Sequence, residues 1–143
     1  MDIDARVPCT ADPAAVYALL LDGSTWPSWS TLGSFEMVRG SDGELGGVRL
    51  FRTGKHLSYE ELVELVPGRR LSYALVPPHN LPFATYRADV DLDGSSVRWH
   101  SQFTMKRAGT GWITKLVFGR FIRRTALGLA ARAEADAGVK VNP

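Results

Sequence analysis

The sequence has a single cysteine, Cys9, among its 143 residues. One cysteine cannot form an internal disulfide, and it cannot supply the paired ligands of a CxxC zinc knuckle. Long apolar runs are also lacking. The longest, residues 14–21, is far shorter than the roughly 20 residues that a membrane-spanning helix needs. Stable insertion into a membrane is therefore not expected.

An excess of charge of one sign is absent as well. Lys and Arg number 17 against 15 Asp and Glu, so the formal net charge is +2. This balance argues against nucleic-acid binding through charge alone. The sequence contains neither a GxxxxGK[ST] or GxGxxG nucleotide loop nor a GxSxG nucleophile motif. The three histidines are not spaced as a metal-ligand set, so we expect no cofactor and no metal.

The composition favours one folded domain over residues 1–143. Hydrophobic residues make up 45% and charged residues 22%, which is enough apolar side chain for a core. The first four residues, Met1 to Asp4, are acidic and no apolar run follows them, so they do not resemble a signal peptide. We therefore expect a cytoplasmic protein, either a monomer or a homodimer.

Local patterns predict a strand, two short helices, a run of strands and one long helix. Asp12 and Pro13 are typical of a helix start, and Asp22-Gly23 of its end. From residue 112 to about 137 there is no Pro, and Ala, Leu and Arg dominate, which favours one helix. The expected elements are a strand over 4–10, helical segments over 13–21 and 24–32, six strands between about 34 and 103, and the final helix.

Three turns set the expected strand pairing. They lie at 93–94, at 54–55 and at 67–69. The pairs they predict are Val90–Val97, Ala88–Trp99, Tyr86–Ser101 and Ala84–Phe103 for the first turn, Leu50–Tyr59 and Arg49–Glu60 for the second, and Leu65–Leu71 and Val63–Tyr73 for the third. The strand faces that these registers turn inward carry Leu50, Arg52, Leu57, Tyr59, Glu61, Val63, Tyr73, Leu75, Tyr86, Ala88, Trp99, Ser101 and Phe103.

Four segments resemble the START/Bet v 1-like (SRPBCC) superfamily, in its polyketide cyclase/dehydrase-like branch. Val7-Pro8 followed by residues 12–17 (DPAAVY) is similar to the opening of that family. Residues 26–30 (WPSWS) are similar to its WPxW helix, and residues 63–73 (VELVPGRRLSY) to its VxExxPxxRLxY hairpin. Residues 111–113 (GWI) lead into an Arg-rich helix as in that branch.

The resemblance implies an α+β helix-grip fold. In that fold a curved antiparallel sheet of about seven strands wraps a long C-terminal helix, and two short helices follow the first strand. A deep apolar cavity between sheet and helix then binds a hydrophobic or aromatic small molecule, such as a lipid or a polyketide. Some members catalyse cyclisation or dehydration inside the cavity, so a polyketide cyclase/dehydratase that uses acid–base chemistry is the alternative function.

Glu61 is the main candidate for chemistry, because it is the one carboxylate on the expected inward face of its strand. Burial would raise its pKa and suit it to acid–base catalysis or to holding a ligand hydroxyl. The structural alternative is that a bulge turns Glu61 outward, or that Arg52 or a tyrosine pairs with it. Arg52 and Tyr86 are the other candidate catalytic residues, since either could polarise a carbonyl; a tyrosine held in the core by one hydrogen bond is the alternative.

Further residues are candidates for binding the ligand. Ala88 and Ser101 are small where a filled core would have larger side chains, and Trp26 and Trp29 lie one helical turn apart. The expected ligand-binding set is Trp26, Trp29, Leu50, Tyr59, Tyr73, His79, Ala88, Trp99, Ser101, Phe103, Ile113 and Val117. For each of them, ordinary core packing or, for His79, a solvated loop is the alternative.

The last helix also permits an interaction module. Its first half is apolar nearly all round, which indicates burial against more than one surface, or a dimer contact if that half is partly exposed. The basic residues Lys115, Arg120, Arg123 and Arg124 could attract an anionic lipid, a membrane surface or a partner, or simply form a solvated face.

Overall fold

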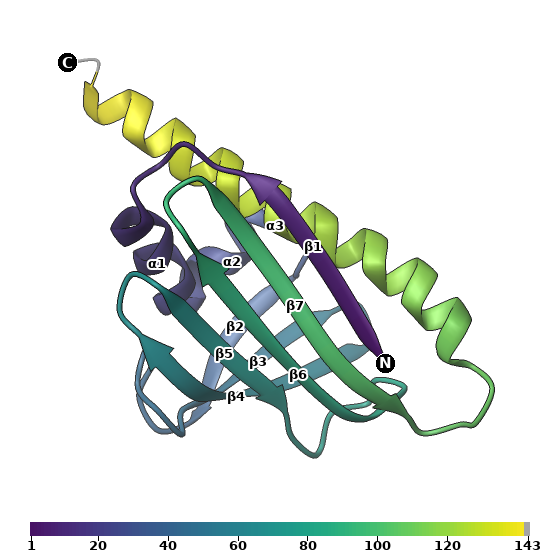
Figure 1. The fold of residues 1–143 in the computed structure, drawn as a ribbon. Coiled ribbons are helices and arrows are strands. Elements are labelled where there is room, and N and C mark those ends of the chain that lie inside the picture. The colour runs from purple at the N-terminus through teal and green to yellow at the C-terminus, as the bar shows by residue number, and fades with distance from the viewer. Residues whose placement is uncertain (142–143) are drawn as a thin grey trace.

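The computed structural model describes the backbone of residues 1–141 and the side chains of residues 1–138 (Figure 1). Its elements, in chain order, are β1 (Asp2–Pro8), α1 (Pro13–Leu21), a 3-10 turn (Gly23–Thr25), α2 (Trp26–Trp29), β2 (Ser34–Arg39), β3 (Val48–Thr53), β4 (His56–Val66), β5 (Arg70–Leu75), β6 (Phe83–Leu92), β7 (Ser96–Met105) and α3 (Gly111–Val141).

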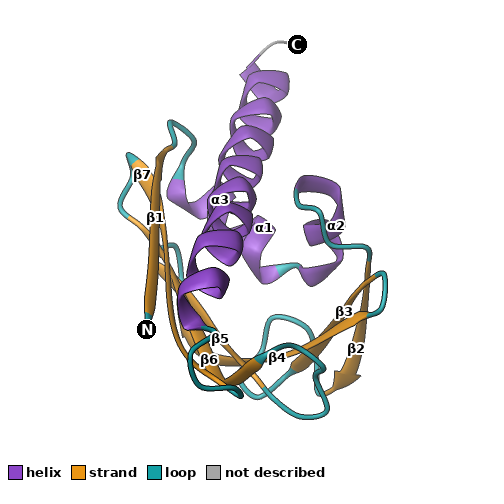
Figure 2. Ribbon diagram, turned by 90° about the vertical axis from the view of Figure 1, so that its right-hand side faces the viewer, coloured by secondary structure: helices purple, strands orange, loops and turns teal. Residues whose placement is uncertain are grey.

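The strands form one antiparallel sheet in the order β1-β7-β6-β5-β4-β3-β2. From β2 to β7, consecutive strands pair with one another, and β1 completes the sheet beside β7. Figure 2 shows that the sheet curves around α3, with α1 and α2 on the same concave side. The predicted helix-grip architecture, with two short helices after the first strand, is therefore confirmed.

Local sequence signals explain how the helices begin and meet. The side chain of Asp12 accepts a hydrogen bond from the Ala14 amide at 3.0 Å, and Pro13 occupies the first helical position, as expected. Gly128 allows α3 to approach α2 closely. A Cβ atom at that position would lie 2.0 Å from the Trp29 carbonyl oxygen. Within the described part of the chain, no helix is both long and apolar enough to span a membrane.

Arg49 of β3 connects the short helices to the sheet. Its guanidinium is 1% exposed and donates hydrogen bonds to the carbonyl oxygens of Leu20 (3.1 Å) and Leu21 (2.5 Å) at the end of α1. It also pairs with Asp42 at 2.8 Å and lies 5.5 Å from the centre of the Trp26 ring. One cation thus satisfies helix-end carbonyls that have no partner within the helix.

Two predicted registers are wrong. The predicted β6–β7 pairs, Ala88–Trp99 among them, are displaced by two residues, because Ala88 pairs with Ser101 and Val90 with Trp99. The turn is longer than two residues: the Asp93 carboxylate accepts bonds from the amides of Ser95 and Ser96. A shift of two residues leaves every side chain on its predicted face.

The second error lies in β4. Leu65 pairs with Leu71 and Leu50 with Tyr59, as predicted. Tyr73, however, pairs with Leu62 and not with Val63, because a β-bulge interrupts the register between Leu62 and Glu64. An extra residue in one strand reverses the alternation of its faces. The side chains before the bulge therefore point opposite to the prediction.

The role of Arg49 predicts a large loss of stability on its removal. Arg49→Leu leaves the Leu21 carbonyl without its donor and removes one of the two donors to the Leu20 carbonyl and to Asp42. Because the buried ion pair with Asp42 is broken as well, the free energy of unfolding should fall by about 3–5 kcal/mol. Urea denaturation followed by circular dichroism measures the change. Arg52→Leu is the matched control, since Arg52 is exposed and pairs only with Glu36; it should cost less than about 1 kcal/mol. Equal losses in the two variants would contradict this role.

Candidate functional site

A cavity of about 520 Å³ lies between the concave face of the sheet and the first half of α3. Its wall combines aromatic and aliphatic side chains with a few polar ones. The lining residues are Trp26, Thr31, Leu32, Phe51, Thr53, His56, Ser58, Glu60, Tyr73, Leu75, Leu81, Pro82, Phe83, Tyr86, Trp99, Ile113, Thr114, Val117, Phe118, Phe121 and Ile122. Both its volume and its largely apolar wall are typical of small-molecule sites.

The cavity has a buried floor and an exposed rim. Trp26, Phe51 and Trp99 are each at most 1% exposed and form the floor, with Trp26 stacked on Phe51 at 5.2 Å. The exposed lining residues come from the loop after α2, the start of β4, the β5–β6 loop and α3; they are Thr31, His56, Pro82, Ile113 and Val117. The opening therefore lies between these loops and the first turns of α3.

Glu60 is the one buried carboxylate on this wall. Its side-chain Oε2 accepts a hydrogen bond from the Ser58 hydroxyl at 2.7 Å. Oε1 has no hydrogen-bond partner, and no other buried side-chain oxygen or nitrogen is unpartnered among the residues described. Burial raises the pKa of Glu60 to about 7, although the Ser58 bond and the charge of Arg49 oppose the rise.

Two phenols lie on the same wall. The Tyr86 hydroxyl is 2.7 Å from Ser101 Oγ, and the Trp99 indole N–H donates to the Tyr73 hydroxyl at 3.3 Å. The two rings are 6.1 Å apart. Burial raises the pKa of both tyrosines well above the ordinary value, so both hydroxyls stay protonated at neutral pH. They can donate hydrogen bonds to a carbonyl oxygen in the cavity.

The structure divides the predicted site residues into three groups. Six lie on the cavity wall: Trp26, Tyr73, Tyr86, Trp99, Ile113 and Val117. Four are buried behind the wall and support it: Trp29, Ala88, Ser101 and Phe103. Trp29 packs against Trp26 at 5.0 Å, and Ser101 positions Tyr86.

The remaining candidates do not face the cavity. Glu61 pairs with Arg39 at 3.5 Å and Arg52 with Glu36 at 2.9 Å. Leu50 and Tyr59 are cross-strand partners on the same convex face. The inward orientation predicted for Glu61, Arg52, Leu50 and Tyr59 is therefore wrong. The predicted alternation of inward and outward side chains runs unbroken from Leu65 back to Leu57. The bulge between Leu62 and Glu64 reverses this alternation for the residues that precede it.

His79 is also away from the wall. Its Nδ1 accepts a hydrogen bond from the Leu81 amide at 3.2 Å. Burial lowers the pKa of His79 below its ordinary value, so the ring is held as a neutral acceptor within the loop. The loop does reach the cavity, but through Leu81 and Pro82.

Ser58 and Glu60 are the functional candidates that the sequence reasoning missed. The correct pairing of Arg49 with Glu60 was available from the turn at 54–55. The pairing alone, however, does not say which face of the sheet the two side chains occupy. The sequence pattern favoured the opposite choice because Leu57, Tyr59 and Val63 are the more apolar set.

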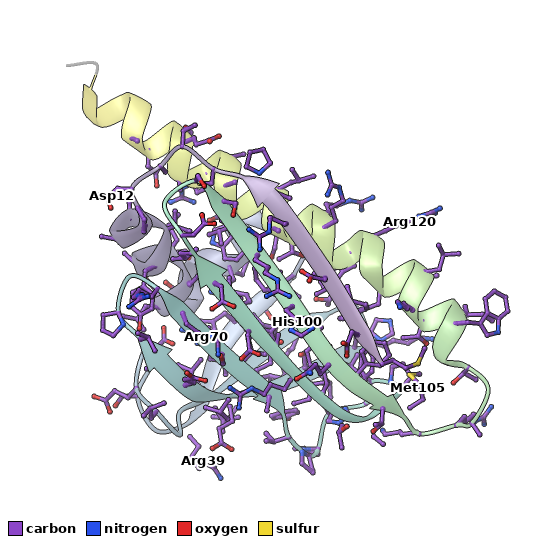
Figure 3. All side chains as sticks on the ribbon, in the orientation of Figure 1. Asp12, Arg39, Arg70, His100, Met105 and Arg120 are labelled. Carbon is purple, nitrogen blue, oxygen red and sulfur yellow. The ribbon has the colours of Figure 1, made fainter. Side chains whose placement is uncertain are left out.

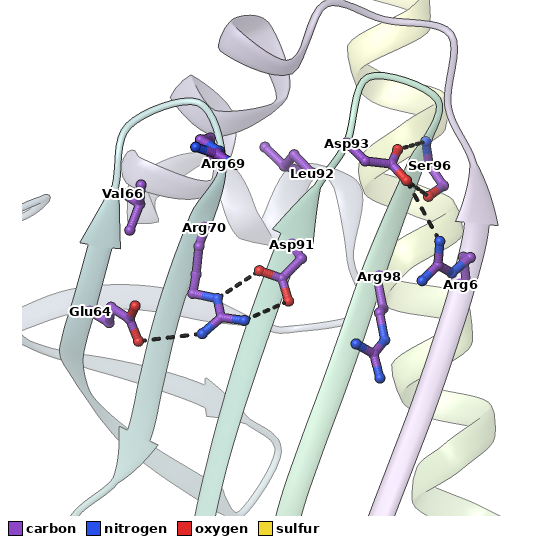
Figure 4. A pocket seen from close by; sticks show the side chains of 10 residues that line it. All are labelled: Arg6, Glu64, Val66, Arg69, Arg70, Asp91, Leu92, Asp93, Ser96 and Arg98. Atoms are coloured by element: carbon purple, nitrogen blue, oxygen red, sulfur yellow. Dashed lines mark hydrogen bonds and ion pairs between the residues drawn. The ribbon is translucent and has the colours of Figure 1, made fainter.

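A second hollow, of about 440 Å³, lies on the convex face of the sheet (Figure 4). Most of its charged side chains form ion pairs. Arg70 pairs with Asp91 at 2.6 Å and with Glu64 at 3.5 Å, and Arg6 with Asp93 at 3.6 Å. This hollow is an open, polar network of ion pairs, so the largely apolar concave cavity is the better candidate site. Among the described side chains, no three His, Cys, Asp or Glu residues converge to hold a metal.

Residues 1–134 match the family described as polyketide cyclase / dehydrase and lipid transport. The chain belongs to this family. The match extends over the sheet, both short helices and most of α3, so it includes every residue of the cavity wall. Membership supports a hydrophobic ligand-binding domain of the SRPBCC type. In a sequence comparison, no curated protein matches the chain.

Solved structures share the fold at low sequence identity. A START superfamily protein from Mycobacterium smegmatis is 14% identical, with a TM-score of 0.75 over 94% of this chain and 97% of that one. The major latex-like protein 151 of Panax ginseng is 14% identical, with a TM-score of 0.73 over 93% and 97%. A protein from Thermus thermophilus is 19% identical, with a TM-score of 0.73 over 95% and 99%. At these identities the likeness shows the fold alone.

Burial of Glu60 predicts a stability that falls as pH rises. In the unfolded chain this carboxyl ionises near its ordinary pKa of 4.5, and in the folded protein near 7. Stability should therefore decline between these two pH values and then level off. Glu60→Gln removes the buried charge, so this variant should exceed the parent by up to about 3 kcal/mol at a pH of about 8 and match it at about 4.

Denaturation of both proteins across this pH range measures the difference. Glu61→Gln is the control, because Glu61 is partly exposed and ion-paired on the other face. A Glu60→Gln difference that does not change with pH would show that folding leaves the pKa of Glu60 at its ordinary value.

Proposed function

We propose that the cavity binds a mainly aromatic or aliphatic small molecule that carries one polar group directed at Glu60. The observation that supports this most directly is the unpartnered Oε1 of Glu60, buried in an otherwise apolar cavity of about 520 Å³. A buried polar atom without a partner costs stability. A ligand hydroxyl or amine that reaches Oε1 recovers that cost and fixes the orientation of the ligand.

The pKa of about 7 defines which polar groups suit the site. Near neutral pH both forms of Glu60 are populated. The carboxylate accepts a hydrogen bond from a hydroxyl or amine, and the acid donates one to a carbonyl. The aromatic floor of Trp26, Phe51 and Trp99 favours a ligand with a flat ring, because stacked and edge-on ring contacts stabilise beyond the area they bury.

A matched pair of ligands tests the polar contact. 2-Naphthol and 2-methylnaphthalene have nearly the same shape, but only the first has a hydroxyl. The parent protein should bind 2-naphthol with at least about tenfold higher affinity than 2-methylnaphthalene, since a hydrogen bond to a charged group contributes about 1.5–3 kcal/mol. In Glu60→Leu this preference should vanish, as measured by titration of ligand fluorescence.

Glu61→Leu is the matched control, because it removes the adjacent carboxylate from the opposite face of the same strand. It should keep the preference for 2-naphthol. Loss of the preference in both variants, or in neither, would contradict the proposal. Mass spectrometry of the purified protein under native conditions would additionally identify any ligand that co-purifies.

The second candidate function is acid–base catalysis of the cyclase/dehydratase type. It is favoured by the titration of Glu60 near neutral pH, where a general base is most effective. Glu60 takes the place of Glu61 as the candidate base. Tyr73 and Tyr86 face the same cavity as protonated donors, so either can stabilise the enolate formed when a proton α to a carbonyl is removed.

Hydrogen–deuterium exchange of the methyl group of 2-acetonaphthone, followed by NMR, tests this candidate. Catalysis predicts protein-dependent exchange that increases with pH through about 7 and is lost in Glu60→Gln while the ketone still binds. A binding protein without catalysis gives bound ketone and no protein-dependent exchange.

A further inference from the structure

The first two turns of α3 expose four large apolar side chains. Trp112 is 67% exposed, Ile113 48%, Leu116 55% and Val117 63%. We call these four residues the α3 apolar patch. At 100° per residue they occupy one side of the helix, while Phe118, Phe121 and Ile122 of the same turns face the cavity. The other exposed large apolar residues, such as Val38 and Leu45, lie on other elements or further along α3.

Basic residues without ion-pair partners among the described side chains lie just before the α3 apolar patch, within it and further along α3. From residue 94 to residue 133 the sequence has no Asp or Glu and eight Lys or Arg, although the net charge of the whole chain is only +2. Arg120, Arg123 and Arg124 continue the exposed side of α3 beyond the patch, and Figure 3 shows Arg120 pointing away from the sheet. Lys106 and Arg107 precede the helix, and Lys115 lies within it.

None of these six basic residues makes an ion pair with a described side chain. In contrast, the arginines of the sheet, such as Arg70 and Arg98, are paired with carboxylates. The cations around the patch are thus available to an external anion. An apolar helix end flanked by basic residues is complementary to an anionic bilayer. The apolar side chains enter the membrane interface, and the basic side chains contact the anionic head groups.

The patch also borders the opening of the cavity. Ile113 and Val117 belong both to the patch and to the cavity wall. A bilayer that covers the patch would therefore lie directly against the opening. A hydrophobic ligand could then pass between the bilayer and the cavity without crossing water.

We propose that the first turns of α3 dock on an anionic phospholipid bilayer and open the cavity toward it for exchange of the hydrophobic ligand. The exchange step rests on the proposed function, whereas docking is independent of it. A second copy of the chain is a poorer occupant. A symmetric contact would bring the same six cations of two molecules together, and like charges oppose such a pair.

Vesicle binding tests docking. The full chain is mixed with vesicles of phosphatidylcholine alone or with about one third phosphatidylserine, and bound protein is measured by sedimentation. Binding should be about tenfold or more stronger with phosphatidylserine and should weaken in high salt. Trp112 serves as a reporter, because the other three tryptophans are at most 6% exposed. Vesicles should protect it from quenching by acrylamide.

Two variants separate the contributions. Trp112→Ser with Leu116→Ser removes apolar contact without altering a residue of the cavity wall, and triple substitution of Arg120, Arg123 and Arg124 by Ser removes charge. Each variant should bind phosphatidylserine vesicles about tenfold or more weakly than the parent protein does. Val38→Ser with Leu45→Ser is the matched control, because these exposed apolar residues lie on β2 and in the β2–β3 loop, at the sheet edge opposite to β1, against which α3 packs; it should bind as the parent does.

Three outcomes would overturn docking. They are no binding of the parent protein to phosphatidylserine vesicles, equal vesicle binding by the parent and the Trp112/Leu116 variant, or a parent protein that is a dimer in solution while this variant is a monomer. The last result would assign the patch to a second copy. Retention of 2-naphthol binding by the Trp112/Leu116 variant separates docking from the cavity. Failure of the parent protein to bind 2-naphthol contradicts the proposed function and leaves the vesicle result to decide docking alone.

Discussion

The attachment of α1 and α2 to the sheet is the constraint on which the cavity depends, and Arg49 supplies it. Its guanidinium bonds the carbonyl oxygens of Leu20 and Leu21, pairs with Asp42 and lies over the Trp26 ring. Because the end of a helix concentrates unpaired carbonyls, a buried cation there is better solvated by protein than elsewhere in the core. With the short helices fixed in this way, Trp26 and Trp29 limit how closely α3 can approach the sheet, and a space remains beside them.

That space carries a cost in stability, which is consistent with a site kept for a ligand. A filled core would place aliphatic side chains where Glu60 and Ser58 lie. Instead, burial keeps a carboxylate there with a pKa near 7 and one oxygen without a partner. Arg49 pairs in register with Glu60 from the neighbouring strand and moderates this cost through its charge. The same residue thus supports the fold of the cavity and the ionisation of the group inside it.

The sequence predicted the order of elements well, because turns, caps and the long Ala-rich helix are local features. The helix start at Asp12-Pro13 and the pairing of Leu50 with Tyr59 needed only neighbouring residues. The side-chain orientations in β4 were not predictable in this way. A bulge between Leu62 and Glu64 has no signature in the apolar pattern, yet it exchanges Glu61 for Glu60 on the concave face. The turn at Asp93 was misjudged for a similar reason, since its side-chain bonds to Ser95 and Ser96 hold a longer loop.

The sequence by itself determined the family, the architecture and the uneven charge of the last third of the chain, because these depend on residue type and order. Only the tertiary structure decided which carboxylate enters the cavity and which apolar residues of α3 stay exposed. From the sequence alone, Trp112 and Leu116 are not distinguishable from Phe118, which packs against the core, or from Ile122, which is part of it. What separates them is the helix face that meets the curved sheet, and that depends on packing between segments far apart in the chain.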